Sequence, residues 1–250
     1  MVGNCLLQHL RSVDSTNTFL LRAAAHGCAR PSAVFADEQT AGRGRQGRQW
    51  VSPARANLYF SLLFELDVPP AEIAGLTLAL GLAARRALSA FGVQTQVKWP
   101  NDLLANGRKL AGILVELAEK AASGRPSLVA GIGINMHMPS ACGSQIGQPW
   151  IDLHQLGVPD ADAEQTRRAL ALSMLEHWTQ AAEHYQVDRL STFQVEWALA
   201  DALYAQALMI EGEGPQHWFG DGIAESGALK VRAGANQRLL HAGEVRICRA

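Results

Sequence analysis

Glycine and arginine alternate in TAGRGRQGRQW, residues 40–50, which we call the Gly/Arg loop. Of all segments in the sequence, this one has the residue types and spacing that point most clearly to a functional site. Within it, GRGRQG at 42–47 matches G-x-G-x-x-G, the spacing of dinucleotide-binding turns. Such a turn must open a helix whose first amides meet the pyrophosphate. Pro53 and a β-rich run follow instead, so a nicotinamide or flavin enzyme is the least supported interpretation.

The arginines favour a loop that closes over an anion. Glycine lets the backbone approach a ligand closely, and guanidinium groups bind carboxylate or phosphate with two parallel hydrogen bonds. Two other interpretations stay open from this segment alone: a solvated surface loop, or a nucleic-acid-binding loop in which Trp50 stacks on a base. The net charge of −1 argues against the latter.

A second candidate site lies in VKWPNDLLANGRKLAGILVE, residues 97–116. Lys98 and Lys109 could neutralise phosphate or carboxylate, and Asp102 could hold Mg²⁺ in a water-rich site. Asn101 and Asp102 could equally be plain turn residues.

Two shorter motifs also have two interpretations each. GIGIN, residues 131–135, ends an apolar strand with glycines that would admit a flat ligand or form a strand bulge. DSTN, residues 14–17, is first of all a helix start with Asp14 or Ser15 as its cap.

The helices and strands that position these residues are predicted from the hydrophobic pattern and from the residues that cap or end such elements. Strands are predicted at 5–10, 32–37, 57–66, 94–100 and 127–138, and helices at 16–26, 71–91, 162–185 and 191–201. Asn106-Gly107 predicts a tight hairpin between two apolar arms. Hairpins mixed with helices favour an α+β domain with a mixed sheet and flanking helices.

The tail has a different pattern. It is rich in glycine, with short strands and expected turns at Asp221-Gly222 and Gly234. This predicts a small antiparallel barrel. We place the boundary near Leu203, which divides the chain into residues 1–202 and 203–250.

Composition limits the class of protein. Of the 250 residues, 48% are hydrophobic and 18% charged, as in a globular protein with a full core. No signal peptide is recognisable, and Arg85-Arg86 interrupts the longest apolar run, which favours a core helix over a membrane span. Cys5, Cys28, Cys142 and Cys248 are too scattered for a disulfide framework or zinc site. We therefore expect a soluble cytoplasmic protein that binds neither DNA nor membranes.

Taken together, the motifs resemble the biotin-protein ligases. The resemblance rests on DSTNTFLL, DEQTAGRGRQGRQWVSP, NLYFSLLF, KWPNDLLANGRKLAGILVE and GIGINM in the family's order. The tail, GIAESGALKV through HAGEVRI, is similar to the family's C-terminal barrel. The resemblance implies a catalytic domain like those of class II aminoacyl-tRNA synthetases, followed by an SH3-like barrel.

The resemblance also implies a two-step reaction. Biotin and ATP with Mg²⁺ would give biotinyl-5′-adenylate and pyrophosphate. A lysine of a biotin carboxyl carrier domain would then attack the adenylate and release AMP. Cations in a desolvated site must offset the repulsion between carboxylate and α-phosphate in the first step.

Site residues are implied by matching positions. The ureido head of biotin would meet Ser15, Thr16, Asn17 and Gln39. The rest of biotin and its carboxylate would meet Arg43, Gly44, Arg45, Lys109 and Gly112. The ATP or adenylate would meet Arg45, Arg48, Trp50, Asn101, Asp102 and Asn135, with Asp102 nearest to Mg²⁺. The catalytic residues would be Lys109, Arg45 and Arg48.

The sequence differs from the family pattern in two places, and a related family of enzymes offers an alternative function. Many relatives carry an N-terminal DNA-binding domain, but this pattern begins by residue 14, so we expect no repressor role. Ala224 replaces a frequent acidic residue of the barrel. Lipoate or octanoate ligases and transferases share the architecture, but STN paired with the Gly/Arg loop suits a polar bicyclic head better. Relatives often form homodimers, although no interface is recognisable from these residues.

Overall fold

The computed structural model describes residues 6–27, 32–118, 126–143, 145–211, 217–242 and 247–249. A seven-stranded sheet is the frame of the larger part, in the order β1-β2-β3-β7-β6-β5-β4. Its strands are β1 (Leu6–Leu10), β2 (Ser32–Ala36), β3 (Asn57–Glu65), β4 (Gln96–Lys98), β5 (Asp102–Ala105), β6 (Arg108–Ala118) and β7 (Ser127–Asn135). Only β1 and β2 pair in parallel, so the predicted mixed sheet is confirmed.

The two long helices cover one face of this sheet. These are α2 (Ile73–Ser89), which follows the 3₁₀ turn η2 (Pro70–Glu72), and α4 (Glu164–Asp188). Trp178 of α4 is fully buried, donates from Nε1 to the carbonyl of Leu80 at 3.0 Å, and meets Phe60 of β3 edge to face. The apolar run that contains Arg85-Arg86 is therefore a core helix. In the described part of the chain, no helix has the length and apolarity that a membrane crossing requires.

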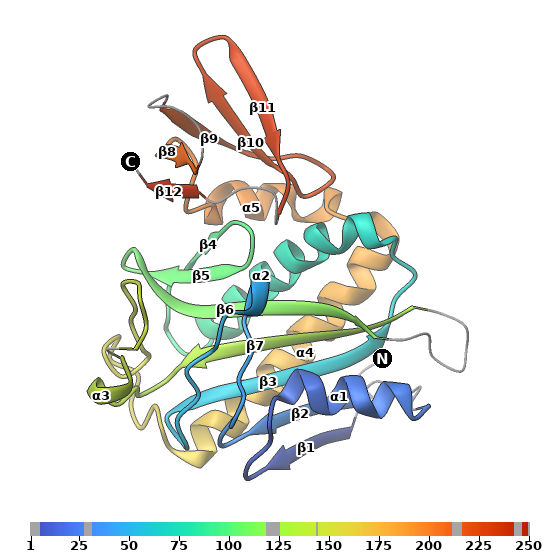
Figure 1. Ribbon diagram of the computed structural model, residues 1–250, viewed down its shortest axis with the longest axis vertical. Coiled ribbons are helices and arrows are strands. Elements are labelled where there is room, and N and C mark those ends of the chain that lie inside the picture. The colour runs from blue at the N-terminus through green and yellow to red at the C-terminus, as the bar shows by residue number, and fades with distance from the viewer. Residues whose placement is uncertain are drawn as a thin grey trace.

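The opposite face, the site face, carries α1 (Thr16–Ala25) at the β1–β2 end. Ser15 caps this helix by accepting a hydrogen bond from the Thr18 amide, and Gly27 follows its end with a φ of +83°. Leu20 and Ala24 pack on Val34 and other side chains of the sheet. Figure 1 shows α1 in front of the sheet and α4 behind it.

The hairpin of β5 and β6 turns as predicted. Asn106 and Gly107 have φ values of 49° and 71°. Two consecutive positive φ angles are the signature of a type I′ turn, which matches the twist of the flanking strands. This tight turn carries Asp102 and Lys109 on neighbouring strands.

The tail forms a second, five-stranded antiparallel sheet in the order β11-β10-β9-β8-β12, at the top of Figure 1. Its strands are β8 (Ala207–Ile210), β9 (Trp218–Ile223), β10 (Leu229–Ala233), β11 (Asn236–Leu240) and β12 (Ile247–Arg249), after the 3₁₀ turn η3 (Ser191–Phe193) and α5 (Gln194–Ala200). This sheet fits the predicted small barrel. Of HAGEVRI, residues 243–246 lie outside the described residues.

One predicted turn is wrong. Asp221 and Gly222 lie inside β9, where both oppose the single residue Lys230 of β10 and form a β-bulge. A glycine at positive φ serves a bulge as well as a turn, and Gly222 has a φ of +83°. The chain instead turns at residues 224–228, whereas the turn at Gly234 is confirmed.

The structure describes the side chain of one cysteine. Cys142 is a free thiol. Cys5, Cys28 and the side chain of Cys248 lie outside the described part of the structure.

Candidate active site

Glycines on the site face leave room above β6 and β7. A Cβ atom on Gly131 would lie 1.9 Å from Asn17 Oδ1, and one on Gly133 would lie 2.3 Å from the indole of Trp50. β7 pairs in regular register with both neighbours, so the bulge interpretation of GIGIN is wrong. The flat group against Gly133 is the protein's own Trp50, whereas Gly131 faces Asn17 and Ser61.

A cavity of about 1190 Å³ opens on this face. It exceeds the usual volume of a single-ligand pocket, roughly 300–1000 Å³, and so has room for two substrates. The structure brings together every residue predicted for the site, all of which line this cavity: Ser15, Thr16, Asn17, Gln39, Arg43, Gly44, Arg45, Arg48, Trp50, Asn101, Asp102, Lys109, Gly112 and Asn135.

One end of the cavity is a neutral hydrogen-bonded network. The Thr16 amide and hydroxyl both donate to Gln39 Oε1, at 2.9 and 3.1 Å, and Gln39 Nε2 donates to Ser52 Oγ at 3.1 Å. Ser61 Oγ lies 2.7 Å from both Thr16 Oγ1 and Asn17 Oδ1. This end therefore presents amide and hydroxyl groups in fixed orientations.

The centre of the cavity is ionic. Lys109 Nζ lies 2.8 Å from Asp102 Oδ1, and each side chain keeps less than a fifth of its exposure, 15% and 17%. The ammonium also lies 5.4 Å from the centroid of the Trp50 ring, within range of a cation–π contact. Burial lowers the pKa of Arg45, and the Asp102 carboxylate partly opposes that shift.

Buried polar atoms without a partner lie beyond the ion pair. Asn135 is 2% exposed, and its Nδ2 donates to the carbonyl of Ile151 at 3.1 Å. Within the described residues, neither Asn135 Oδ1 nor Trp50 Nε1 has a hydrogen-bond partner. Such atoms are costly in a folded protein, and both residues line the cavity.

The Gly/Arg loop folds over the cavity as a narrow hairpin. The Gly44 amide donates to Arg48 O at 2.7 Å and the Trp50 amide to Gly42 O at 3.0 Å, around the 3₁₀ turn η1 (Arg45–Gly47). A Cβ on Gly42 would lie 2.3 Å from Ser52 Oγ, so only glycine fits there. The loop opens no long helix, which confirms that its dinucleotide-like spacing is coincidental.

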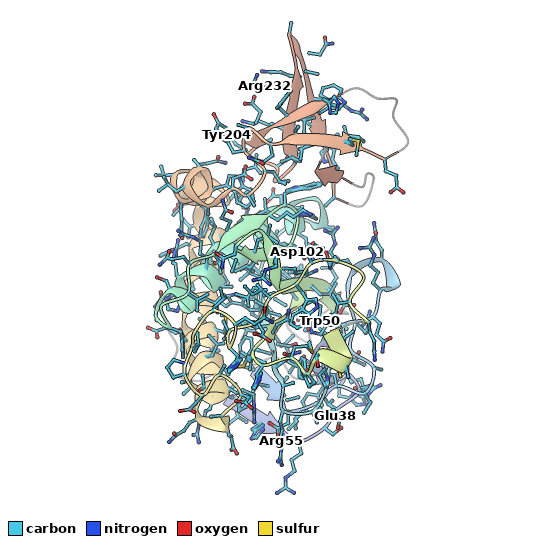
Figure 2. The ribbon with its side chains drawn as sticks, turned by 90° about the vertical axis from the view of Figure 1, so that its left-hand side faces the viewer. Glu38, Trp50, Arg55, Asp102, Tyr204 and Arg232 are labelled. Carbon is cyan, nitrogen blue, oxygen red and sulfur yellow. The ribbon has the colours of Figure 1, made fainter. Side chains whose placement is uncertain are left out.

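The segments that flank the Gly/Arg loop are hydrogen-bonded to each other at its base. The Arg55 amide donates to Asp37 O at 2.8 Å. Arg167 of α4, 3% exposed, donates to Arg55 O at 3.0 Å and lies 3.4 Å from Asp37 Oδ1. Figure 2 shows Glu38 and Arg55 together below Trp50 and Asp102, so the loop rises from this base toward the ionic centre.

Several residues that line the cavity, or contact residues that line it, were not predicted from the sequence. Ser61 is the one polar residue in the apolar run YFSLLF, a signal that could have found it. Trp150 lies in a loop whose backbone pairs with Lys109, since the Lys109 amide donates to Pro149 O at 3.0 Å. The C-terminal sheet also contributes to the cavity, through Met209, Ile210 and Glu211. No local sequence pattern predicts this contribution.

The chain is similar to several known proteins. A sequence model of the Biotin/lipoate A/B protein ligase family matches residues 9–135. The Bifunctional ligase/repressor BirA of Escherichia coli (strain K12) is 36% identical over 219 residues, which cover 87% of this chain and 66% of that protein. The Biotin--[acetyl-CoA-carboxylase] ligase of Paracoccus denitrificans is 32% identical over 94% of this chain and 98% of its own length.

A solved structure is also similar along nearly the whole chain. The biotin protein ligase from Aquifex aeolicus, in complex with biotin and ATP, superimposes with a TM-score of 0.79 at 26% identity. The match covers 98% of this chain and 99% of that one.

Proposed function

The chain belongs to the biotin/lipoate A/B protein ligase family, and we propose that it is an ATP-dependent biotin–protein ligase. The observation that carries the proposal is the division of one cavity into an end of amide and hydroxyl groups and an ionic centre that contains Lys109 and Arg45. A ureido head needs acceptors for its N–H groups and donors for its carbonyl. A carboxylate and a triphosphate need the cations.

In the first step a carboxylate oxygen of biotin attacks the α-phosphorus of ATP. The bond from that phosphorus to the bridging oxygen breaks, and pyrophosphate leaves with the electron pair. Lys109 binds the carboxylate and holds it against a second anion, while Arg45 and the exposed Arg48 face the phosphates. Asp102 holds the Lys109 ammonium in place before substrates bind.

Mg²⁺ fits this donor set in one specific way. Asp102 is the carboxylate paired with Lys109 at the ionic centre, and Glu211 reaches the cavity from the C-terminal sheet. The described residues contain no cluster of three or more His, Cys, Asp or Glu side chains for a metal. This suits an ion held mainly by nucleotide phosphates and water, with Asp102 as a protein ligand. Bound there, Mg²⁺ would offset phosphate charge.

In the second step the neutral amine of an acceptor lysine attacks the carbonyl carbon of the adenylate. The C–O bond to AMP breaks, an amide forms, and AMP leaves. Lys109 remains beside the acyl-phosphate oxygen, and the Gly/Arg loop with Trp50 limits the access of water. The acceptor is a biotin carboxyl carrier domain.

The polar end of the cavity disfavours the lipoate or octanoate alternative. An octanoyl tail would bury the amide and hydroxyl groups of Thr16, Asn17 and Gln39 without partners for the bonds they still offer. A site built to bind polar groups rejects an analogue that lacks them by factors of about 10⁴.

ATP–pyrophosphate exchange tests the proposal with biotin, lipoate and octanoate compared side by side. We expect exchange with biotin alone. Exchange only with lipoate or octanoate would contradict the substrate, and no exchange with any of the three would contradict the adenylation. A cytoplasmic location and a homodimer stay predictions, the second to be checked by sedimentation velocity.

A further inference from the structure

Glu116 is a charged residue on the site face of β6 that the proposed chemistry does not use. It follows Gly112 and Leu114 at alternate positions of the strand, so its side chain points to the same face as theirs. Its side chain is 19% exposed. It therefore lies near the polar end of the cavity, partly shielded from water.

The carboxylate of Glu116 fixes the orientation of Asn17. Asn17 Nδ2 donates to Glu116 Oε2 at 2.9 Å and to Leu114 O at 3.2 Å. Both amide hydrogens of Asn17 are thereby used. Only Asn17 Oδ1, which lies 2.7 Å from Ser61 Oγ, can still accept a bond from a ligand.

The same carboxylate holds the Gly/Arg loop. Arg43 Nη2 donates to Glu116 Oε1 at 2.7 Å, and Arg43 Nη1 lies 3.4 Å from Oε2. This is a two-point contact between a guanidinium and a carboxylate, among the stronger hydrogen-bonded pairs in proteins. The pair connects the Gly/Arg loop to β6 of the seven-stranded sheet.

We infer that Glu116 is a positioning residue that couples recognition of the substrate head group to closure of the Gly/Arg loop. One carboxylate sets Asn17 as an acceptor for a head-group N–H and at the same time anchors Arg43. The inference rests on the proposed function, because the head group it names is the ureido ring of biotin.

The direct test is Glu116→Gln. The glutamine keeps the size of the side chain, but its amide N–H groups would face Asn17 Nδ2 or Arg43, donor against donor. We expect a biotin Kd raised about tenfold and an adenylate lifetime shortened about tenfold, the effect of losing a charge-assisted pair. The melting temperature should stay at the parental value, which separates this effect from a general loss of structure.

Glu196→Gln is a matched control. Glu196 pairs with Arg86 between α5 and α2, and its side chain is 21% exposed, close to the 19% of Glu116. It does not line the cavity. We expect this variant to keep the parental biotin Kd and adenylate lifetime.

A second readout needs no ligand. Trypsin cleaves after arginine, and the Gly/Arg loop offers Arg43, Arg45 and Arg48. Cleavage within the loop should be faster in Glu116→Gln than in the parent and in Glu196→Gln. Equal cleavage rates together with an unchanged biotin Kd and adenylate lifetime would overturn the inference alone. A parent that forms no biotinyl adenylate would overturn the proposed function and the inference with it.

Discussion

At the scale of single residues, the contact on which the proposed chemistry most depends is the Lys109–Asp102 ion pair. A partly buried ammonium beside one carboxylate is held in place before substrates arrive, so little reorganisation accompanies the reaction. The same residues show what a sequence can reveal. Charged residue types next to a hairpin signal predicted their proximity, because the Asn106-Gly107 turn pairs β5 with β6 and sets Leu104 opposite Lys109. The register shift between Leu103 and Leu104, which sets Asp102 opposite Gly112, was not predicted.

Lys109→Gln should suppress adenylate formation by roughly 10²–10³-fold, the usual loss when one stabilising donor is removed from an active site. The loss should fall on the kcat of ATP–pyrophosphate exchange more than on biotin Kd, because the head-group network is untouched. Near-parental exchange in this variant would remove Lys109 from the catalytic residues. Arg108→Gln, a change on the adjacent half-buried arginine, is the control.

At the scale of elements, the sequence predicted the long helices and most of the strands, but not the contacts between them. Caps, prolines and apolar periodicity are local, so Ser15, Gly27 and the Asn-Gly turn predicted their elements correctly. Ser61 and Glu116 act through Asn17, which lies 44 and 99 residues away in the chain. Only the strand order β3-β7-β6 brings them together, and no local pattern encodes that order.

Gly133→Ala tests the packing of the loop on the sheet. The new Cβ would lie 2.3 Å from the Trp50 indole, so Trp50 must move and the loop must open. We expect a shorter adenylate lifetime with little change in melting temperature. In a double-mutant cycle, Gly133→Ala should add nothing to Trp50→Ala, because the clash is then absent. Additive effects would show that the alanine acts elsewhere.

Asp201, next to the end of α5, gives a pH-dependent prediction. Burial raises the pKa of this carboxyl group, although it accepts bonds from Leu203 N and Trp197 Nε1. The folded state therefore holds the proton more tightly than the unfolded state. Its contribution to the free energy of unfolding falls as the pH rises from the ordinary Asp pKa to the raised value.

Asp201→Asn should remove the pH dependence that this carboxyl group gives to the free energy of unfolding. Urea unfolding of parent and variant across that pH range measures the difference between them, which should shift in favour of the variant as the pH rises. A constant difference across the range would contradict the raised pKa.

At the scale of the whole molecule, the C-terminal sheet is joined to the seven-stranded sheet beside the cavity. Trp99 Nε1 donates to Gly227 O at 3.0 Å, and the Ala202 amide donates to Val97 O at 3.0 Å. Met209 and Glu211 then line the cavity from the second sheet. The site is thus completed by a part of the chain about 100 residues beyond Asp102.

Gly227→Ala should weaken this junction. Gly227 has a φ of +82°, and a Cβ there would lie 2.7 Å from the backbone nitrogen of Gly75. We expect a loss of roughly 1–3 kcal/mol in the free energy of unfolding, typical of overpacking. A raised KM for ATP with an unchanged biotin Kd should accompany it. Gly147→Ala, which meets nothing within 4 Å, is the control for stability.

The most direct measurement of the central claim is the intact mass of a purified biotin carboxyl carrier domain after incubation with this protein, biotin, ATP and Mg²⁺. We expect the addition of one biotinyl group, which depends on ATP and is absent when the acceptor lysine is replaced by arginine. An unmodified carrier, or a carrier modified with lipoate or octanoate in place of biotin, would contradict it.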